Sequence, residues 1–194
     1  MKLGKYIMPG SKKLGVFFVG LGLLFCPSSP LQAQEVPEYQ LKAAFLYNFA
    51  KFVEWPQDAF QDSNSSLIVG ILGEDPFGDH IDFIRNKSVK NRKLEIRHFD
   101  TIEDANNCHI LFVSASEAEG LVEVLESLNN LTILTVSDMD LFIENGGIIK
   151  FELNDEKLGF TINSEAIKQA DFKISSQLLK FGKLVKVEPK PAGD

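Results

Sequence analysis

The stretch LIVGILGEDPFGD, residues 67–79, decides the fold class, because it combines a buried strand with the turn and helix that follow it. Residues 67–73 form an apolar, β-branched run without alternation, which is typical of a strand covered on both faces. Asp75 and Pro76 favour the start of a helix. That short helix should carry its apolar side chains on one side: Phe77, Ile81 and Ile84. A strand that leads into a helix predicts a parallel sheet covered by helices.

Segments further along the chain extend this pattern. Strands are predicted at residues 93–99, 109–113 and 131–136, and a helix should begin with Ser116 as its cap and end at Leu128. This order of strands and helices implies a mainly parallel sheet whose crossovers are right-handed.

The C-terminal third departs from that rhythm. After a short helix at residues 140–144, the runs IIKFEL and LGFTIN (148–153 and 158–163) flank a polar loop and predict an antiparallel hairpin. A brief helix should start at Ser164, and a last helix is expected over residues 174–187. The prediction is an α/β fold: a single domain with a mixed, mostly parallel sheet, flanked by helices, with a C-terminal antiparallel hairpin.

Residues 1–33 have the pattern of a secretory signal peptide, since several lysines precede an apolar run and a Pro/Ser segment. The run is shorter than the ~20 residues that a membrane-spanning helix needs, which disfavours an uncleaved anchor. Ala33 suits the residue before the cut. Cys26 leaves a lipoprotein signal as an alternative, although the bulky Phe25 before it fits that signal poorly. We therefore expect an exported protein.

The predicted domain covers residues 34–188, and residues 189–194 should form a disordered tail. Loss of the four lysines in the signal peptide leaves 16 of the 20 basic residues against 27 acidic ones, which changes the formal net charge from −7 to −11. So acidic a chain is an unexpected partner for nucleic acid. Cys108 becomes the only thiol, so no intramolecular disulfide can form. It is expected to be a buried small side chain, and an intermolecular disulfide is the alternative.

The segment FLYNFAKFVEWP, residues 45–56, is rich in aromatic residues and belongs to the best helix pattern in the chain, Tyr39 to Val53. Its apolar residues recur at spacings of three and four and should face the core: Leu41, Ala44, Phe45, Phe49, Phe52 and Val53. Lys42 is expected on the opposite side. The residues that the core does not explain form a candidate partner surface: Tyr47, Asn48, Lys51 and Trp55. Trp55 alternatively covers the end of the helix.

The sequence does not predict an enzyme, a metal site or a cofactor. His80, His98 and His109 are isolated from one another, and none belongs to a metal-binding or nucleophile motif. Cys108 and His109 are neighbours on a predicted strand and point to opposite faces, so they cannot act as nucleophile and base.

One loop has the character of a ligand site because it follows a central strand at its carboxyl end. Its candidate residues are Gly73, Glu74, Asp75, Phe77 and Gly78. The glycine spacing matches no dinucleotide or phosphate loop, and two acidic residues disfavour a phosphate. Two interpretations remain open: glycines that only permit tight turns while Asp75 caps the helix, or a pocket for a small, neutral or cationic molecule.

Several blocks in order give the chain a family resemblance: KAAFLYNFAKFVEWP, LGEDPFG, CHILFVSASE, LTVSD, NGGIIKF and INSEAIKQADFKISSQLLKF. From about Tyr39 to Lys186, the chain resembles the YfiR-like family of periplasmic regulators. The resemblance implies a compact α/β protein that represses a membrane-bound diguanylate cyclase through the periplasmic sensor domain of that enzyme, and so limits cyclic-di-GMP and biofilm formation. Relatives with paired cysteines differ from this chain, so redox control by intramolecular disulfides is not implied.

Two functions follow as hypotheses. The first is a periplasmic repressor that binds the periplasmic domain of an inner-membrane diguanylate cyclase or sensor kinase, with homodimerisation as a further expectation. The second is a periplasmic small-molecule binding or sensor protein whose ligand lies over the loop that starts at Gly73.

Overall fold

The computed structural model of the chain describes residues 36–129, 131–155, 157–170 and 172–187. The predicted signal peptide with Cys26, and the predicted tail, lie outside these residues. The described residues belong to one compact unit.

An eight-stranded sheet forms the centre of this unit, in the order β10-β8-β7-β6-β5-β2-β4-β3. Strands β4, β2, β5, β6 and β7 run parallel to one another, whereas β8 pairs antiparallel with β7, and β3 pairs antiparallel with β4. The strands are β2 (Leu67–Leu72), β3 (Ser88–Val89), β4 (Arg92–Phe99), β5 (Ile110–Val113), β6 (Leu134–Ser137), β7 (Ile149–Asn154), β8 (Lys157–Asn163) and β10 (Lys183–Val185). The predicted mixed, mostly parallel sheet and the hairpin β7–β8 are confirmed.

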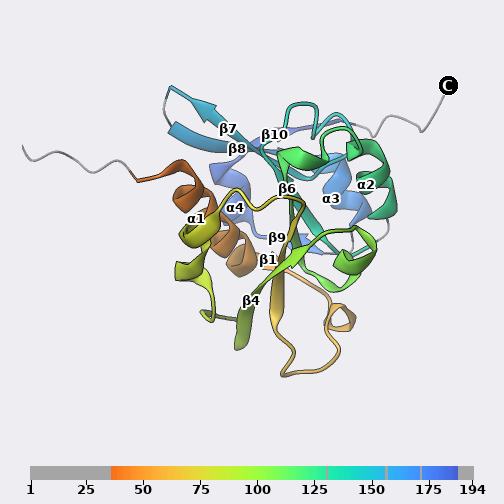
Figure 1. The fold of residues 1–194 in the computed structure, drawn as a ribbon. Helices are drawn as coiled ribbons and strands as arrows, with labels where there is room; N and C mark the ends of the chain where they lie inside the picture. Colours follow the sequence, from red (N-terminus) through yellow and green to blue (C-terminus); the bar gives the residue numbers. More distant parts are fainter. Residues whose placement is uncertain (1–35, 130, 156, 171, 188–194) are drawn as a thin grey trace, which may run out of the picture. The chain divides into compact units, whose positions relative to one another are not determined.

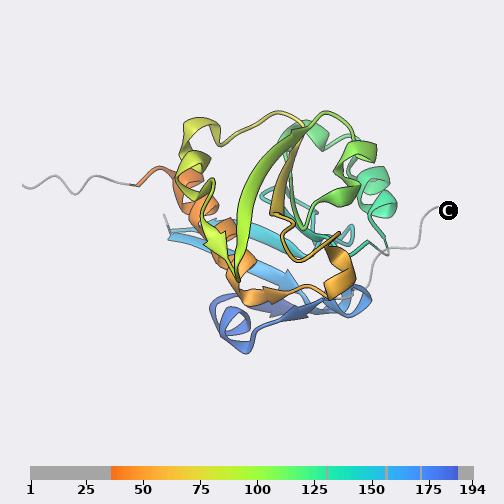
Figure 2. The same ribbon diagram turned by 90° about the horizontal axis from the view of Figure 1, so that it is seen from below.

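Helices cover both faces of the sheet, with α1 on one side and α2 on the other (Figures 1 and 2). The α-helices are α1 (Glu38–Phe52), α2 (Leu121–Ser127), α3 (Ser164–Gln169) and α4 (Ser176–Phe181). Short 3-10 helices complete the connections: η1 (Gln57–Ala59), η2 (Gly78–Ile84), η3 (Glu103–Asn107) and η4 (Ala115–Glu117). Strands β1 (Val53–Glu54) and β9 (Lys173–Ile174) form a separate small antiparallel pair.

The core consists of two apolar clusters, one on each face of the sheet. Val69 and Ile71 of β2 belong to the cluster under α1 and η2, whereas Ile68 and Leu72 belong to the cluster under α2 and η3. Because successive side chains of a strand point to opposite faces, β2 contributes to both clusters. The prediction that this strand is buried on both faces is confirmed.

Helix α1 has the predicted position but a shifted inner face. Its buried residues are Lys42, Ala43, Leu46, Phe49 and Ala50, while Leu41 is exposed. Placing Lys42 on the outer side was wrong, because its ammonium group pairs with Asp138, just after β6, and with Glu38 on α1.

Three local predictions in the rest of the chain were wrong. Ser116 does not cap α2, which begins after Gly120, because the Ser116 hydroxyl accepts a hydrogen bond from the Glu74 N–H. Residues 140–144 form turns in place of a helix, and Leu141 has a φ of 60°. The expected helix over residues 174–187 ends at Phe181, and the chain then forms β10, which pairs in parallel with β8.

We predict that Leu46→Ala lowers the free energy of unfolding by about 2–5 kcal/mol, because the side chain is fully buried and its loss leaves a cavity. Urea unfolding of the mature domain measures the change. Leu153→Ala is the matched control, since Leu153 is 56% exposed and its truncation should stay within about 0.5 kcal/mol. Equal losses in the two variants would contradict the assignment of the α1 core.

Candidate functional site

The loop after β2 is held in place by backbone hydrogen bonds. Gly73 has a φ of 82°, and its N–H donates to the carbonyl of Phe99. A Cβ atom at this position would collide with the side chains of Ser116 and Glu117, so the close approach of these segments requires glycine. The Glu74 N–H donates to Ser116 Oγ over 3.0 Å. These contacts connect the carboxyl ends of β2 and β5.

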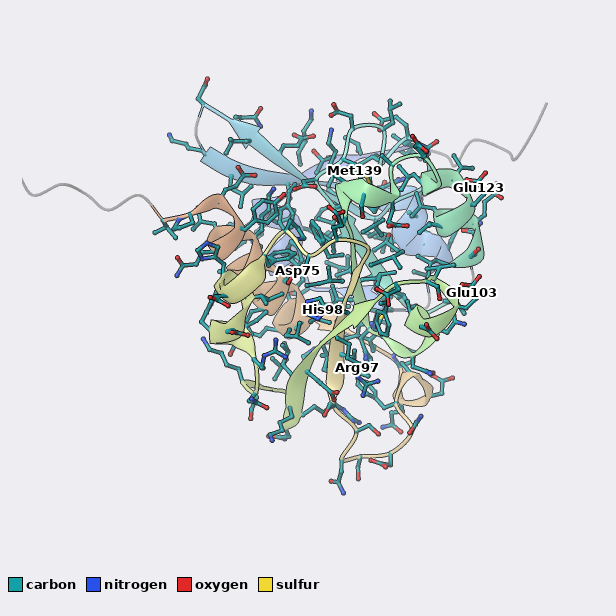
Figure 3. The ribbon with its side chains drawn as sticks, viewed as in Figure 1. Asp75, Arg97, His98, Glu103, Glu123 and Met139 are labelled. Carbon is teal, nitrogen blue, oxygen red and sulfur yellow. The ribbon has the colours of Figure 1, made fainter. Side chains whose placement is uncertain are left out.

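Asp75 completes the loop and links it to β4. Its Oδ1 accepts from the Phe77 N–H over 2.8 Å, and its Oδ2 lies 3.0 Å from Nε2 of His98 (Figure 3). Phe77 is buried and packs edge-on against Phe112, with ring centroids 4.8 Å apart. Gly78 has a φ of 50°. This geometry agrees with glycines that permit tight turns. Asp75 holds the turn before η2, whose N-cap residue is Phe77 and which has no side-chain cap. Ligand binding at the loop stays a prediction.

A buried lysine joins α1 to the carboxyl end of β6. Lys42 is 2% exposed and forms ion pairs with Glu38 and Asp138, and Tyr39 donates its hydroxyl to Asp138 over 2.9 Å. Burial opposes the charged form, but the hydrogen bonds to both carboxylates outweigh it and raise the pKa of Lys42. Only the i,i+4 spacing of Glu38 and Lys42 could have signalled this pair in the sequence.

A surface of aromatic rings and lysines lies on α1, on η2 and on the turn between η2 and β3. We name it the Tyr47 surface and define it as Tyr47, Lys51, Phe83 and Lys87. The Lys51 and Lys87 ammonium groups lie 5.5 and 5.0 Å from the centre of the Tyr47 ring, and Lys87 is also 5.1 Å from the Phe83 ring. Both lysines and Phe83 are exposed. Asn48, the other candidate on α1, is half-buried.

The opposite side of the sheet is acidic. The chain from residue 98 to residue 149 contains no Lys or Arg, and its acidic residues include Glu103 on η3 and Glu123 on α2 (Figure 3). Both carboxylates are exposed. Charge is therefore distributed unevenly over the protein, and the Tyr47 surface supplies cations to a molecule that is acidic as a whole.

Among the described residues, the Trp55 ring packs against the buried ring of His109 and not against the aromatic rings of the Tyr47 surface. Its ring lies 5.9 Å from His109 in a T-shaped arrangement and 6.3 Å from Phe172. The packing favours the structural interpretation, in which Trp55 covers the end of the helix.

His109, at the start of β5, is 4% exposed. Its Nδ1 accepts a hydrogen bond from the Ile68 N–H over 3.1 Å, so the neutral ring carries its proton on Nε2. The ring stacks on Phe60 with centroids 4.4 Å apart. Burial lowers the pKa of His109 to about 4; the backbone of Ala59 acts in the other direction, and the charge of Arg92 adds to the lowering.

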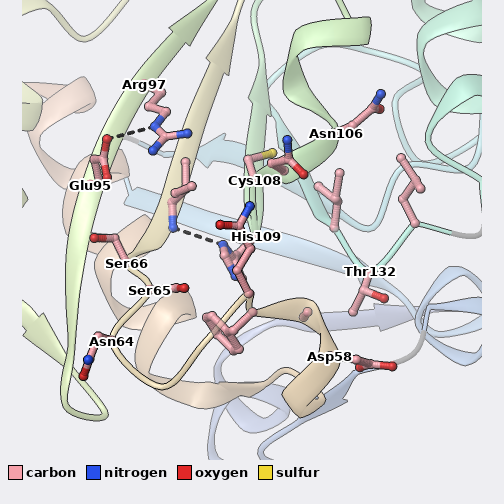
Figure 4. A pocket seen from close by; sticks show the side chains of 17 residues that line it. Asp58, Asn64, Ser65, Ser66, Glu95, Arg97, Asn106, Cys108, His109 and Thr132 are labelled. Carbon is pink, nitrogen blue, oxygen red and sulfur yellow. Dashed lines mark hydrogen bonds and ion pairs between the residues drawn. The ribbon is translucent and has the colours of Figure 1, made fainter.

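A cavity of about 500 Å³ opens beside His109 at the amino ends of β2, β5 and β6. Figure 4 shows His109 between the Glu95–Arg97 ion pair and Thr132. Sequence reasoning missed this cavity, because it expected a ligand at the carboxyl ends of the strands.

Cys108 lines the same cavity, but its side chain belongs to the apolar cluster under α2. It is 4% exposed, and burial raises the pKa of its thiol to about 12. The prediction of a buried small side chain is confirmed.

Two further features concern the described residues alone. They contain no group of three or more His, Cys, Asp or Glu side chains that could hold a metal ion. Among their helices, none has the length and apolar character needed to cross a membrane.

Comparisons with known proteins concern the whole domain. A family model described as YfiR/HmsC-like matches residues 39–183. No curated protein gives a significant match. A crystal structure of a conserved domain protein from Vibrio cholerae O1 biovar El Tor str. N16961 is similar, with a TM-score of 0.54 and 10% sequence identity. The match covers 78% of this chain and 61% of that one, so this chain spans less than two thirds of its length. At this identity the likeness shows the fold alone.

We predict that the stability of the domain falls as the pH decreases from 6.5 to about 4, because of His109. Between these pH values His109 binds a proton in the unfolded chain but not in the folded one. Over the whole range this lowers the free energy of unfolding by about 3 kcal/mol. Urea unfolding at neutral pH and near pH 4 measures the loss.

The variant His109→Asn is the comparison, because an amide oxygen can still accept from the Ile68 N–H while the side chain no longer titrates. Other groups titrate equally in both proteins, so the variant should lose less stability on acidification. His98→Asn is the matched control, because it makes the same substitution at an exposed histidine, the partner of Asp75. An identical pH dependence in wild type and His109→Asn would show that the lowered pKa is wrong.

Proposed function

We propose, because this chain belongs to the YfiR/HmsC-like family, that it represses a membrane-bound signalling enzyme by binding the periplasmic domain of that enzyme. The family is a regulatory one. Membership in it supports a general role for this chain as a periplasmic regulator of cyclic-di-GMP signalling. The proposed target is a diguanylate cyclase. A sensor kinase is the second candidate, and small-molecule sensing is the alternative function.

The observation that carries the proposal is the Tyr47 surface. Aromatic rings with polar handles are the residues that anchor protein interfaces, and exposed cations beside them provide electrostatic selectivity. Neither lysine of this surface has an ion-pair partner among the described contacts, since both ammonium groups lie over rings. We infer that the partner presents an acidic segment to α1 and η2.

Export is part of the same proposal. A signal peptide over residues 1–33, cut after Ala33, would deliver the domain to the compartment in which the sensor domain of the enzyme lies. Repression then requires that the free regulator prefer one state of its partner, because a ligand shifts an equilibrium only by its difference in affinity for the two states.

We predict that Lys51→Glu combined with Lys87→Glu raises the half-inhibitory concentration of the regulator at least tenfold, a loss of about 1.4 kcal/mol in binding. The measurement is cyclic-di-GMP synthesis from GTP by inner membranes of the native host, titrated with purified mature protein. Reversed charges should repel an acidic partner while leaving the fold intact, because both side chains are exposed.

The control is Lys157→Glu combined with Lys168→Glu, which makes the same change of charge at exposed positions of β8 and α3. It should inhibit like the wild type. If both pairs of substitutions weaken inhibition equally, net charge is responsible and the Tyr47 surface is not the interface. If the wild type does not change cyclic-di-GMP synthesis at all, the proposed repression itself is refuted.

Homodimerisation is a second part of the proposal. Strand β10 forms one edge of the sheet, and two exposed apolar side chains lie beside it: Phe181, 76% exposed, and Leu184, 52% exposed. An edge strand offers unpaired backbone groups to another chain, and a two-fold axis would join two such edges.

We predict that the mature protein sediments as a dimer at micromolar concentration, and that Phe181→Glu combined with Leu184→Glu converts it to a monomer. Burying the two new carboxylates in a dimer contact would cost more than the contact gains. Sedimentation equilibrium distinguishes the two states. A monomeric wild type would refute the dimer and leave the proposed repressor activity untouched.

A further inference from the structure

Residues 56–66, which we name the η1 segment, join β1 to β2 and contact the buried ring of His109. None of these residues is fully buried. Their backbone-to-backbone hydrogen bonds stay within the segment: Ala59 to Pro56, Phe60 to Gln57, and Ser65 to Asp62. A segment with so few buried contacts can open for a small part of the free energy that unfolds the whole domain.

Two side chains from the rest of the domain hold the segment in place. The Phe60 ring stacks on the ring of His109, with 4.4 Å between the centroids, and the Arg92 guanidinium lies 3.7 Å from the centre of Phe60. Nη1 of Arg92 also donates to the backbone carbonyls of Asp62 and Ser65, over 2.9 and 2.8 Å. Phe60 is therefore the centre of the closed arrangement.

The closed arrangement does not accommodate a second proton on His109. Its Nδ1 accepts from the Ile68 N–H over 3.1 Å, so this nitrogen has to remain unprotonated (Figure 4). A proton on Nδ1 would face the Ile68 donor, and the imidazolium would have to leave its position. The Ala59 backbone favours the protonated ring, but burial opposes it more strongly and lowers the pKa of His109 to about 4.

The charges around the ring do not offset that burial. Strands β2 and β6, which flank β5, have no titratable side chains. The other elements around the ring contribute these charged or titratable groups: Glu54, Asp58, Asp62, Glu95, Arg97 and Cys108. None of them pairs with His109 among the described contacts, whereas Arg92 acts on the ring with a like charge. A protonated ring therefore needs water, from which the closed segment separates it.

We propose that the η1 segment is an acid-sensitive latch: a second proton on His109 breaks the stack with Phe60, and residues 56–66 move away while the sheet stays folded. The His109 backbone donates to Ile68 and accepts from Leu134 independently of the ring, so β5 keeps its place between β2 and β6. The segment forms one wall of the cavity beside His109, so opening removes that wall. The latch goes beyond the proposed repression and does not depend on the Tyr47 surface.

The only tryptophan of the chain reports the latch, because Trp55 directly precedes the segment and packs against His109. Acrylamide quenching of its fluorescence and far-UV circular dichroism are measured on the same samples of the whole mature protein, from neutral pH to about pH 3.5. We expect the quenching constant to rise about twofold or more at a higher pH than the loss of ellipticity. Protonation without opening would leave the access of acrylamide to Trp55 unchanged.

His109→Asn is the comparison, because the amide oxygen can still accept from the Ile68 N–H and binds no proton. Its quenching constant should keep the neutral value until the domain unfolds, whereas His98→Asn, at an exposed histidine, should open like the wild type.

Hydrogen exchange of the wild type supplies a second measurement that does not depend on the folding of a variant. The Ile68 amide, which donates to the His109 ring, should lose protection in acid before the Leu134 amide, which donates to the His109 carbonyl. The proposal is overturned if the two amides lose protection at the same pH, or if quenching does not rise before ellipticity is lost. It is also overturned if His109→Asn opens at the same pH as the wild type.

Discussion

Burial of β2 on both faces is the constraint on which the rest of the structure depends. All six residues of this strand are buried, and they alternate between the cluster under α1 and the cluster under α2. Each large apolar side chain gains about 1.5–3 kcal/mol from burial, so leaving either face uncovered would forfeit several kcal/mol. The backbone of such a strand also needs neighbours on both sides, which β4 and β5 provide. Two layers of helix and a sheet that extends in both directions follow from that single strand.

Features that depend on neighbouring residues could be predicted from the sequence, whereas those that depend on distant partners could not. The position of α1, the burial of β2 and the hairpin β7–β8 follow from local periodicity and turn residues. Lys42 is buried because Asp138 lies beside it, and 96 residues separate the two in the chain. The last segment has an apolar pattern that suits a helix, but part of it forms β10 because the edge of β8 is available for pairing. Tertiary contacts override local propensity at such positions.

The same distinction explains the candidate site. A ligand loop after β2 was predicted from the general behaviour of open α/β sheets, and the loop does lie at the carboxyl end of a central strand. In this loop Phe77 is buried, and the Glu74 N–H and the Asp75 carboxylate pair with Ser116 and His98. The cavity lies at the other end of the strands and is assembled from four separate segments of the chain. A single histidine in the sequence could not reveal that its ring is buried and accepts a hydrogen bond from the Ile68 N–H.

The uneven charge distribution determines where an acidic partner could approach the protein. A protein that is strongly acidic overall is repelled by acidic molecules at long range, so an acidic partner can approach only where cations are concentrated. The lysines of the Tyr47 surface provide such a place, and the cation–π contacts hold them over Tyr47 and Phe83 instead of in ion pairs. Because those lysines are not neutralised within the chain, their charge remains available to a partner.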